Sequence, residues 1–205
     1  MAKLIARFYD PAEGAVRVDG VDLREVELGS FRRQLGVVLQ DPFLFSGTIA
    51  DNIRFANPEA TDEQVEATAA AIGVDKVAAR FDEGLQHEVR EGGAGLSSGE
   101  RQLISIARAL LADPRILVLD EATSNIDRPT EVLIEHALDR LLRGRTSIII
   151  AHRLSTVRRA DEILVVENGQ IIQRGTEREL LAVDGPFRRL AHTLDGGEPE
   201  LAAAG

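Results

Sequence analysis

Two short segments of the chain combine residue types that can bind and hydrolyse a nucleotide. The first reads Leu96-Ser97-Ser98-Gly99-Glu100. The second is the apolar run 116–119, which ends in Asp120 and Glu121. A helix that starts at the first segment has free backbone amides, and the positive end of its dipole faces outward, where a phosphate can bind. A buried strand that ends in two carboxylates can place a magnesium ion and an attacking water at its carboxyl end.

The helix start has two explanations, and the residues alone leave both open. Ser97 and Glu100 have the spacing of a capping box, and an apolar helix face continues after them, so an ordinary capped helix accounts for the pattern. The functional explanation is that Gly95, Ser97 and Gly99 leave the helix N-terminus uncluttered, so that a phosphate can approach it.

The two acids have equally clear alternatives. Asp120 can hold magnesium through water, and Glu121 can polarise the attacking water. The competing explanation is a plain strand end with solvated charges, because acids often follow strands in turns.

A histidine and a glutamine follow two further strand-like runs. His152 comes directly after the apolar run 148–151 and can hydrogen-bond a terminal phosphate if its strand neighbours the one that ends at Asp120. Gln40 ends the run 33–39, and its amide oxygen is a hard ligand that suits magnesium. The alternatives are a turn or packing role for His152 and a turn glutamine before Asp41-Pro42 for Gln40.

The elements that must position these residues indicate an α/β protein. Runs 33–39, 116–119 and 147–151 predict strands, and the last two are nearly continuous apolar runs, as in a parallel sheet that is buried on both faces. Residues 131–142 have helical spacing and precede Gly144, a typical helix stop. The stretch of about 51–112 is mostly helical by pattern and predicts an insertion between two sheet strands.

Shorter elements complete the predicted order. Asp19-Gly20 and Asn168-Gly169 are hairpin turn signals. Residues 2–8 and 178–194 have helical patterns. Residues 196–205 are mostly Gly, Ala, Glu and Pro and are expected to be disordered.

Composition limits the function classes. The chain has 205 residues and a formal net charge of -10, which argues against nucleic acid as the main partner because phosphate backbones favour basic surfaces. It has no cysteine, so disulfides and thiolate metal sites are excluded. Its apolar runs are far shorter than the ~18 residues of a membrane span. A role at a membrane therefore needs transmembrane segments from elsewhere.

Taken in order, these motifs resemble the nucleotide-binding domain of an ATP-binding cassette (ABC) transporter. Residues 96–100 are similar to the family signature Leu-Ser-Gly-Gly-Gln, 116–121 to the Walker B strand and 124–127 to the D-loop. Gln40 matches the Q-loop and His152 the switch histidine. Segments 7–11, 40–49 and 89–93 resemble the exporter branch.

The resemblance implies a P-loop NTPase-like, mostly parallel sheet with a helical signature subdomain. It covers residues 1–195 as a partial domain, with the helical subdomain at about 51–112 inserted in a RecA-like core. It also implies ATP and Mg²⁺ as ligands, a location at the cytoplasmic face of the cell membrane, and no nucleic-acid partner.

In this family two domains pair head to tail, and each ATP lies between the Walker motifs of one domain and the signature of the other. The implied catalytic residues are Glu121 and His152, and the implied metal ligands are Gln40 and Asp120. The implied nucleotide-binding residues are Gln40, Asp120, Leu96, Ser97, Ser98, Gly99, Glu100 and Asp127. Asp127 would shape the interface between the two sites, while Phe43, Phe45 and Glu91 would lie near the surface that receives the transmembrane coupling helices.

Two residues depart from the signature: Ser98 replaces a glycine and Glu100 replaces a glutamine. Ser98 adds a side chain, and Glu100 adds negative charge, close to where a phosphate would dock. Both are expected to weaken the site shared with the partner. Such departures resemble heterodimeric exporters with one weak site, so the partner can be identical or non-identical.

The sequence contains no Gly-Lys-Ser/Thr, the end of the phosphate-binding Walker A loop, and Met1 falls just after its expected place. A fragment is the simplest expectation, with little or no ATP hydrolysis by the chain alone. Two alternatives stay open. One is a non-catalytic truncated subunit that only pairs with a complete ABC partner, and the other is a soluble ABC ATPase that acts on nucleic acid.

Overall fold

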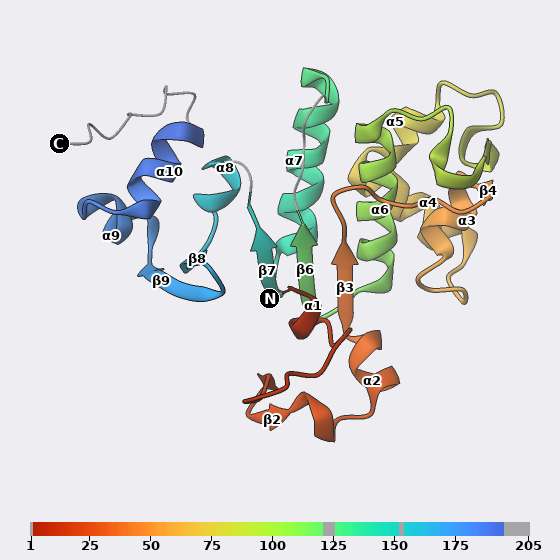
Figure 1. Ribbon diagram of the computed structural model, residues 1–205. Helices are drawn as coiled ribbons and strands as arrows, with labels where there is room; N and C mark the ends of the chain where they lie inside the picture. The colour runs from red at the N-terminus through yellow and green to blue at the C-terminus, as the bar shows by residue number, and fades with distance from the viewer. Residues whose placement is uncertain (1, 121–125, 152–153, 195–205) are drawn as a thin grey trace. The chain divides into compact units, whose positions relative to one another are not determined.

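The computed structural model describes residues 2–120, 126–151 and 154–194 (Figure 1). The chain divides into two compact units, Met1–Ile149 and Ile150–Gly205. None of the described helices is long and apolar enough to cross a bilayer. The predicted disordered tail, 196–205, lies outside the described residues.

A three-stranded sheet with the order β3-β6-β7 positions the predicted site (Figure 1). Its strands are β3 (Leu35–Val38), β6 (Ile116–Asp120) and β7 (Thr146–Ile150). Strands β3 and β6 run parallel, in a register that pairs Leu35 with Ile116 and Val38 with Leu119. The centre of β6 is buried, as its unbroken aliphatic run predicts. The predicted α/β class with a parallel sheet is therefore confirmed.

Two long helices cover this sheet and contribute much of the core. Helix α6 (Ser98–Ala112) packs against α7 (Arg128–Leu142) and against β3. The buried α6 side chains Leu103, Ile104 and Ile106 join Leu117 of β6 and Leu141 of α7 in one hydrophobic cluster. The apolar spacing of both helices thus forms the packed face.

The insertion between β3 and β6 is mostly helical. It contains β4 (Gly47–Thr48), α3 (Ile49–Arg54), α4 (Asp62–Ile72), α5 (Val74–Ala78), η2 (Gly84–Gln86), β5 (Glu88–Val89), η3 (Glu91–Gly93) and α6. Strands β4 and β5 form a short antiparallel pair that the helical pattern did not predict. The pairing joins residues far apart in the chain, so no local periodicity marks it.

The N-terminal segment contains α1 (Ala2–Ile5), β1 (Arg17–Val18), β2 (Val21–Asp22), η1 (Leu23–Glu25) and α2 (Leu28–Arg33). The predicted hairpin turn is confirmed, since Asp19 and Gly20 both have positive φ, at 50° and 83°. The predicted helix 2–8 is too long. Arg7 adopts a left-handed φ of 50° and donates from Nη1 to the carbonyl oxygen of Val26 at 2.8 Å, which ends the helix.

The second unit contains α8 (Leu154–Val157), β8 (Ile163–Glu167), β9 (Gln170–Gly175), α9 (Glu177–Ala182) and α10 (Pro186–Leu194). The predicted hairpin at Asn168-Gly169 is confirmed. The prediction of one helix over 178–194 is wrong, because Pro186 cannot continue a preceding helix and instead occupies the first position of α10. Buried Leu180 and Phe187 pack α9 and α10 into the core of this unit.

Candidate active site

The predicted magnesium ligands lie at one edge of the sheet. The parallel register places Asp120, the last residue of β6, beside the residue that follows β3, and Gln40 is one position further on. Both side chains offer an oxygen ligand. Magnesium is commonly held by one or two carboxylates together with waters and substrate phosphates, so this sparse donor set suits an ion shared with a phosphate. Among the described residues, no group of three or more His, Asp and Glu side chains forms a metal cluster by itself.

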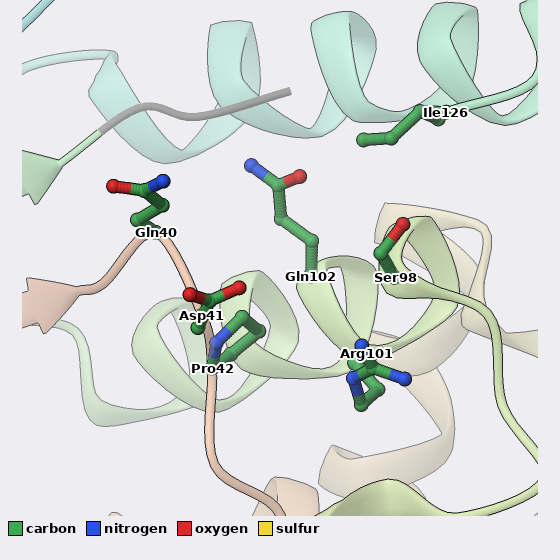
Figure 2. A pocket seen from close by; sticks show the side chains of 7 residues that line it. All are labelled: Gln40, Asp41, Pro42, Ser98, Arg101, Gln102 and Ile126. Carbon is green, nitrogen blue, oxygen red and sulfur yellow. The ribbon is translucent and has the colours of Figure 1, made fainter. Parts of the chain in front are cut away.

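A pocket beside Gln40 joins three segments that are distant in the sequence (Figure 2). Its lining residues are Gln40, Asp41, Pro42, Ser98, Arg101, Gln102 and Ile126. Figure 2 shows the Gln102 side chain between Gln40 and Ile126. Ser98 and Gln102 are one helical turn apart and therefore share a face of α6. Sequence reasoning singled out Gln40 and Ser98 but gave Arg101 and Gln102 no role, because their meeting with the loop after β3 is non-local.

The N-terminus of α6 has the capping box that the sequence predicts. Ser97 Oγ accepts a hydrogen bond from the Glu100 amide at 3.3 Å, and Glu100 Oε2 accepts one from the Ser97 amide at 2.8 Å. Ser97 and Ser98 are exposed. Within the described part of the chain, the amides of Ser98 and Gly99 have no backbone or side-chain acceptor. Two donors without an acceptor in this part of the chain, one in exposed Ser98 and one in buried Gly99, thus lie at the positive end of a 15-residue helix, an arrangement that can bind an anion.

Packing requires a glycine at position 99, in addition to the access for a phosphate that the sequence predicts. A Cβ at this position would lie 2.5 Å from Thr130 Cγ2 and 3.1 Å from Ile126 Cγ2. The first turn of α7 therefore approaches the backbone of α6 too closely for a side chain. The same glycine brings the two helix N-termini together.

The remaining signature residues are buried. Leu96 and Glu100 are each 7 % exposed. Arg101 donates from Nη1 to the Leu96 carbonyl oxygen at 2.7 Å, and its side chain fills the space against Gly93. Glu100 also forms an ion pair with Arg80, with 2.6 Å between Oε1 and Nη2. Arg101 and Arg80 thus hold the buried residues of the signature segment in place, and its two serines are exposed.

Asp127 is the N-cap of α7. Its Oδ1 accepts a hydrogen bond from the Thr130 amide at 3.0 Å. The bonds from the Thr130 backbone and hydroxyl lower the pKa of Asp127, because they stabilise the carboxylate. The side chain is exposed next to the α6 N-terminus, since Gly99 contacts the same turn of α7.

An aromatic patch of Phe43, Phe45 and Phe55 lies on the surface of the helical insertion. These side chains are 49 %, 40 % and 56 % exposed. Phe45 stacks on Phe55 with a centroid separation of 4.2 Å and meets Phe43 edge-on at 5.3 Å. Arg108 lies against the rings of Phe45 and Phe55 and bonds the backbone oxygens of Phe43 and Asn52. The sequence pointed to Phe43 and Phe45, whereas Phe55 and Arg108 carry no local signal.

The two predicted catalytic residues, Glu121 and His152, lie outside the described residues. Residues 124–125 of the predicted D-loop do so as well. Their roles remain predictions.

A parallel sheet with polar side chains at its carboxyl edge, and a helical insertion with an exposed, capped helix start, are features of the nucleotide-binding domains of ABC transporters. The chain belongs to this family: the family model described as "ABC transporter" matches residues 1–124. This confirms the resemblance drawn from the motifs.

Two curated relatives of the chain carry the names of ABC transporter proteins. It is 52 % identical over 190 residues to the uncharacterized ABC transporter ATP-binding protein YknV of Bacillus subtilis, covering 93 % of the chain and 32 % of that protein. It is 48 % identical over 190 residues to the fatty acid ABC transporter ATP-binding/permease protein of Mycobacterium bovis, covering 93 % of the chain and 30 % of that protein.

Among solved structures, a bacterial Atm1-family ABC exporter with ATP bound superposes with a TM-score of 0.87 at 39 % identity, over 100 % of this chain and 35 % of that one. The chain therefore spans about a third of the length of these relatives.

Proposed function

We propose that the chain is the nucleotide-binding part of an ABC exporter and couples ATP binding and hydrolysis to substrate export. The observation that carries this proposal is the pairing of two features in one unit: Gln40 and Asp120 at one edge of the parallel sheet, and an exposed helix start with two amides that have no acceptor among the described residues. The ATP-binding/permease names of the relatives support it. The proposed domain is residues 1–195, with the helical subdomain at about 51–112.

In the chain's own nucleotide site, Gln40 and Asp120 would hold Mg²⁺, which neutralises phosphate charge when bound. Glu121 would orient and polarise the attacking water, and His152 would hydrogen-bond the terminal phosphate. The sheet register supports the shared position of Gln40 and Asp120.

In the site shared with a second nucleotide-binding domain, the signature residues 96–100 would face the partner's ATP. Ser97 and Ser98 are exposed, and the amides of Ser98 and Gly99 have no acceptor among the described residues, which supports a surface that is open to a partner. Asp127 would lie at the interface because its turn packs on Gly99. The head-to-tail pair can be a homodimer or a heterodimer.

The aromatic patch would receive the coupling helices of a transmembrane domain, which would hold the chain at the cytoplasmic face of the membrane. Three exposed phenylalanines that are fixed by Arg108 present a preformed apolar surface, as a docking helix needs. Substrate selection would belong to that transmembrane domain.

We further propose that the chain alone binds ATP weakly, because its sequence contains no Gly-Lys-Ser/Thr to surround the phosphates. Calorimetric titration of the purified chain with ATP, with and without Mg²⁺, tests this point. We expect no binding in the micromolar range. Micromolar affinity for ATP would contradict the proposal.

A complementation assay tests the shared site. The partner is the complete ATP-binding domain of YknV with its own signature motif disabled by mutation, so that it cannot form a productive homodimer. We expect the chain to restore Mg²⁺-dependent ATP hydrolysis by this partner, and Ser97→Ala to abolish the restoration. Thr61→Ala is the matched control, since Thr61 caps α4 through the same kind of capping box away from the site.

If the wild-type chain restores no hydrolysis, the proposed pairing is wrong. If both serine and threonine variants lose the restoration equally, helix capping rather than a phosphate contact explains the loss. Salt-sensitive binding of the chain to nucleic acid would instead favour the soluble-ATPase alternative.

A further inference from the structure

The carboxylate of Glu100 has both oxygens engaged at the start of α6. Oε2 accepts from the Ser97 amide at 2.8 Å, and Oε1 pairs with Arg80 Nη2 at 2.6 Å. The side chain of Glu100 is only 10 % exposed. A negative charge is therefore buried within one helical turn of the free amides of Ser98 and Gly99, and a cation from another segment neutralises it.

Arg80 is held in place by its own surroundings. It follows the C-terminal end of α5, and its Nε donates to the Val77 carbonyl oxygen at 3.4 Å. Its guanidinium carbon lies 5.4 Å from the centroid of the Phe81 ring, and Phe81 stacks on His87 at 3.6 Å. The cation thus has a fixed position beside Glu100, although 54 % of its side chain remains exposed.

The electrostatic consequence concerns any anion at the helix start. An acid in the first turn of a helix is favourable for the helix itself, because it faces the positive end of the dipole. The same acid competes with a phosphate for that positive potential and repels it directly. Burial strengthens the repulsion, because the surrounding dielectric is low. A bare Glu100 would therefore oppose phosphate binding at Ser98 and Gly99.

We propose that Arg80 is a positioning residue for the phosphate site that the signature helix presents to its partner. By pairing with Glu100, Arg80 cancels the charge of that carboxylate and keeps it turned away from the free amides of Ser98 and Gly99. The inference rests on the proposed function, since it assumes that a partner's nucleotide docks at this helix start. It revises the expectation that Glu100 simply weakens the site.

The ion pair makes the need for a cation at position 80 depend on the residue at position 100. A glutamine at position 100 can still cap Ser97 through its amide oxygen, but it then turns its NH₂ group toward the Arg80 guanidinium, so that two donors face each other. A glutamine therefore needs no cation at position 80, whereas a glutamate does. The effect of removing Arg80 should depend on which residue stands at position 100.

The test is a double-mutant cycle in the complementation assay with the full chain and the YknV partner domain. The KM for ATP and kcat are measured for the wild type, Arg80→Ala, Glu100→Gln and the double variant. In the presence of Glu100, we expect Arg80→Ala to raise the KM for ATP about tenfold, through loss of charge compensation. In the Glu100→Gln background, we expect Arg80→Ala to change the KM by less than about twofold.

Three further measurements separate this role from a structural one. Raising the salt concentration should reduce the Arg80→Ala defect, because the repulsion is screened. Arg80→Lys should retain most of the wild-type affinity, since the positive charge remains. Lys76→Ala removes a positive charge from α5 that is not paired with Glu100 and should leave the KM unchanged.

The outcomes are distinct. An equal rise in KM in both backgrounds, or no rise in either, overturns the role of Arg80 while the proposed function stands. Failure of the wild-type chain to restore hydrolysis overturns the proposed function, and this inference with it.

Discussion

Arg108 is expected to stabilise the aromatic patch, and Arg108→Ala tests this. Its guanidinium donates from Nε to the Asn52 carbonyl oxygen at 2.8 Å and from Nη2 to Asn52 Oδ1 at 2.9 Å. A third bond runs from Nη1 to the Phe43 carbonyl oxygen at 3.1 Å. The guanidinium carbon also lies 5.5 Å and 5.4 Å from the ring centroids of Phe45 and Phe55. The variant removes all five contacts.

The magnitude follows from these contacts and from what offsets them. A hydrogen bond that involves a charged group contributes roughly 1.5–3 kcal/mol, and a cation–π contact contributes roughly 0.5–1 kcal/mol. Burial lowers the pKa of Arg108, and the same desolvation of its charge is expected to offset part of this gain. Asn52 keeps its two bonds to the Phe45 backbone, so it is not left unsatisfied. We therefore expect a loss of about 2 kcal/mol in the free energy of unfolding.

Urea unfolding of the chain, followed by circular dichroism, measures this loss. With an m-value of roughly 2 kcal/mol/M, the midpoint should fall by about 1 M at unchanged m. Arg140→Ala is the matched control, because Arg140 is an exposed helical arginine with a single bond of 3.3 Å to Ala71, and it should change stability by less than about 0.5 kcal/mol. Arg108→Lys should be intermediate, since lysine lacks the planar fork.

A loss below about 0.5 kcal/mol for Arg108→Ala would refute the reasoning, because the three bonds would then contribute no more than a surface contact. A change in m would instead indicate an altered denatured or native ensemble, and the midpoint alone would not measure the contacts.

Three further predictions follow from the packing and charge of the first unit. Gly99→Ala should destabilise the chain by about 1–3 kcal/mol through overpacking, and Thr130→Ser, which removes Cγ2, should recover much of that loss; no recovery would exclude the Thr130 methyl as the cause. Gly36→Ala should also destabilise, because a Cβ there would lie 2.7 Å from Pro114 Cγ, and an unchanged melting temperature would contradict this. The lowered pKa of Asp127 stabilises the fold above its unfolded pKa, near 4, and this contribution is lost as the pH falls through the folded-state pKa. Asp127→Asn should therefore flatten the fall in melting temperature between pH 5 and pH 2, and an unaltered slope would show that Asp127 does not cause it.

Much of the fold was predictable because its signals are local. The aliphatic run of β6, the capping box of Ser97 and Glu100, and the Asn168-Gly169 turn each depend on residues within a few positions of one another. The prediction of one helix over 178–194 is wrong for a local reason too, because Pro186 ends the helical pattern before it and begins α10.

The candidate site was predictable only in part. Gln40 and Asp120 were each predicted at the end of a strand, and the parallel register brings these two strand ends to one edge of the sheet. The sequence explains the glycine at position 99 only in part, since Thr130, which approaches it closely, lies on a helix far along the chain. The sequence shows the charge of Glu100 but not its partner, because Arg80 lies in a different helix–loop segment.

The sequence by itself determined the family, the α/β class and the residue types at the candidate site, because each is encoded in contiguous motifs with a periodicity or spacing of their own. Only the tertiary structure decided which distant side chains meet, as in the ion pair of Arg80 with Glu100 and the hydrogen bond from Arg108 to Asn52. Ion pairs and close helix contacts depend on how separate elements pack in three dimensions. The spacing of residues along one segment carries no information about the distance between that segment and another.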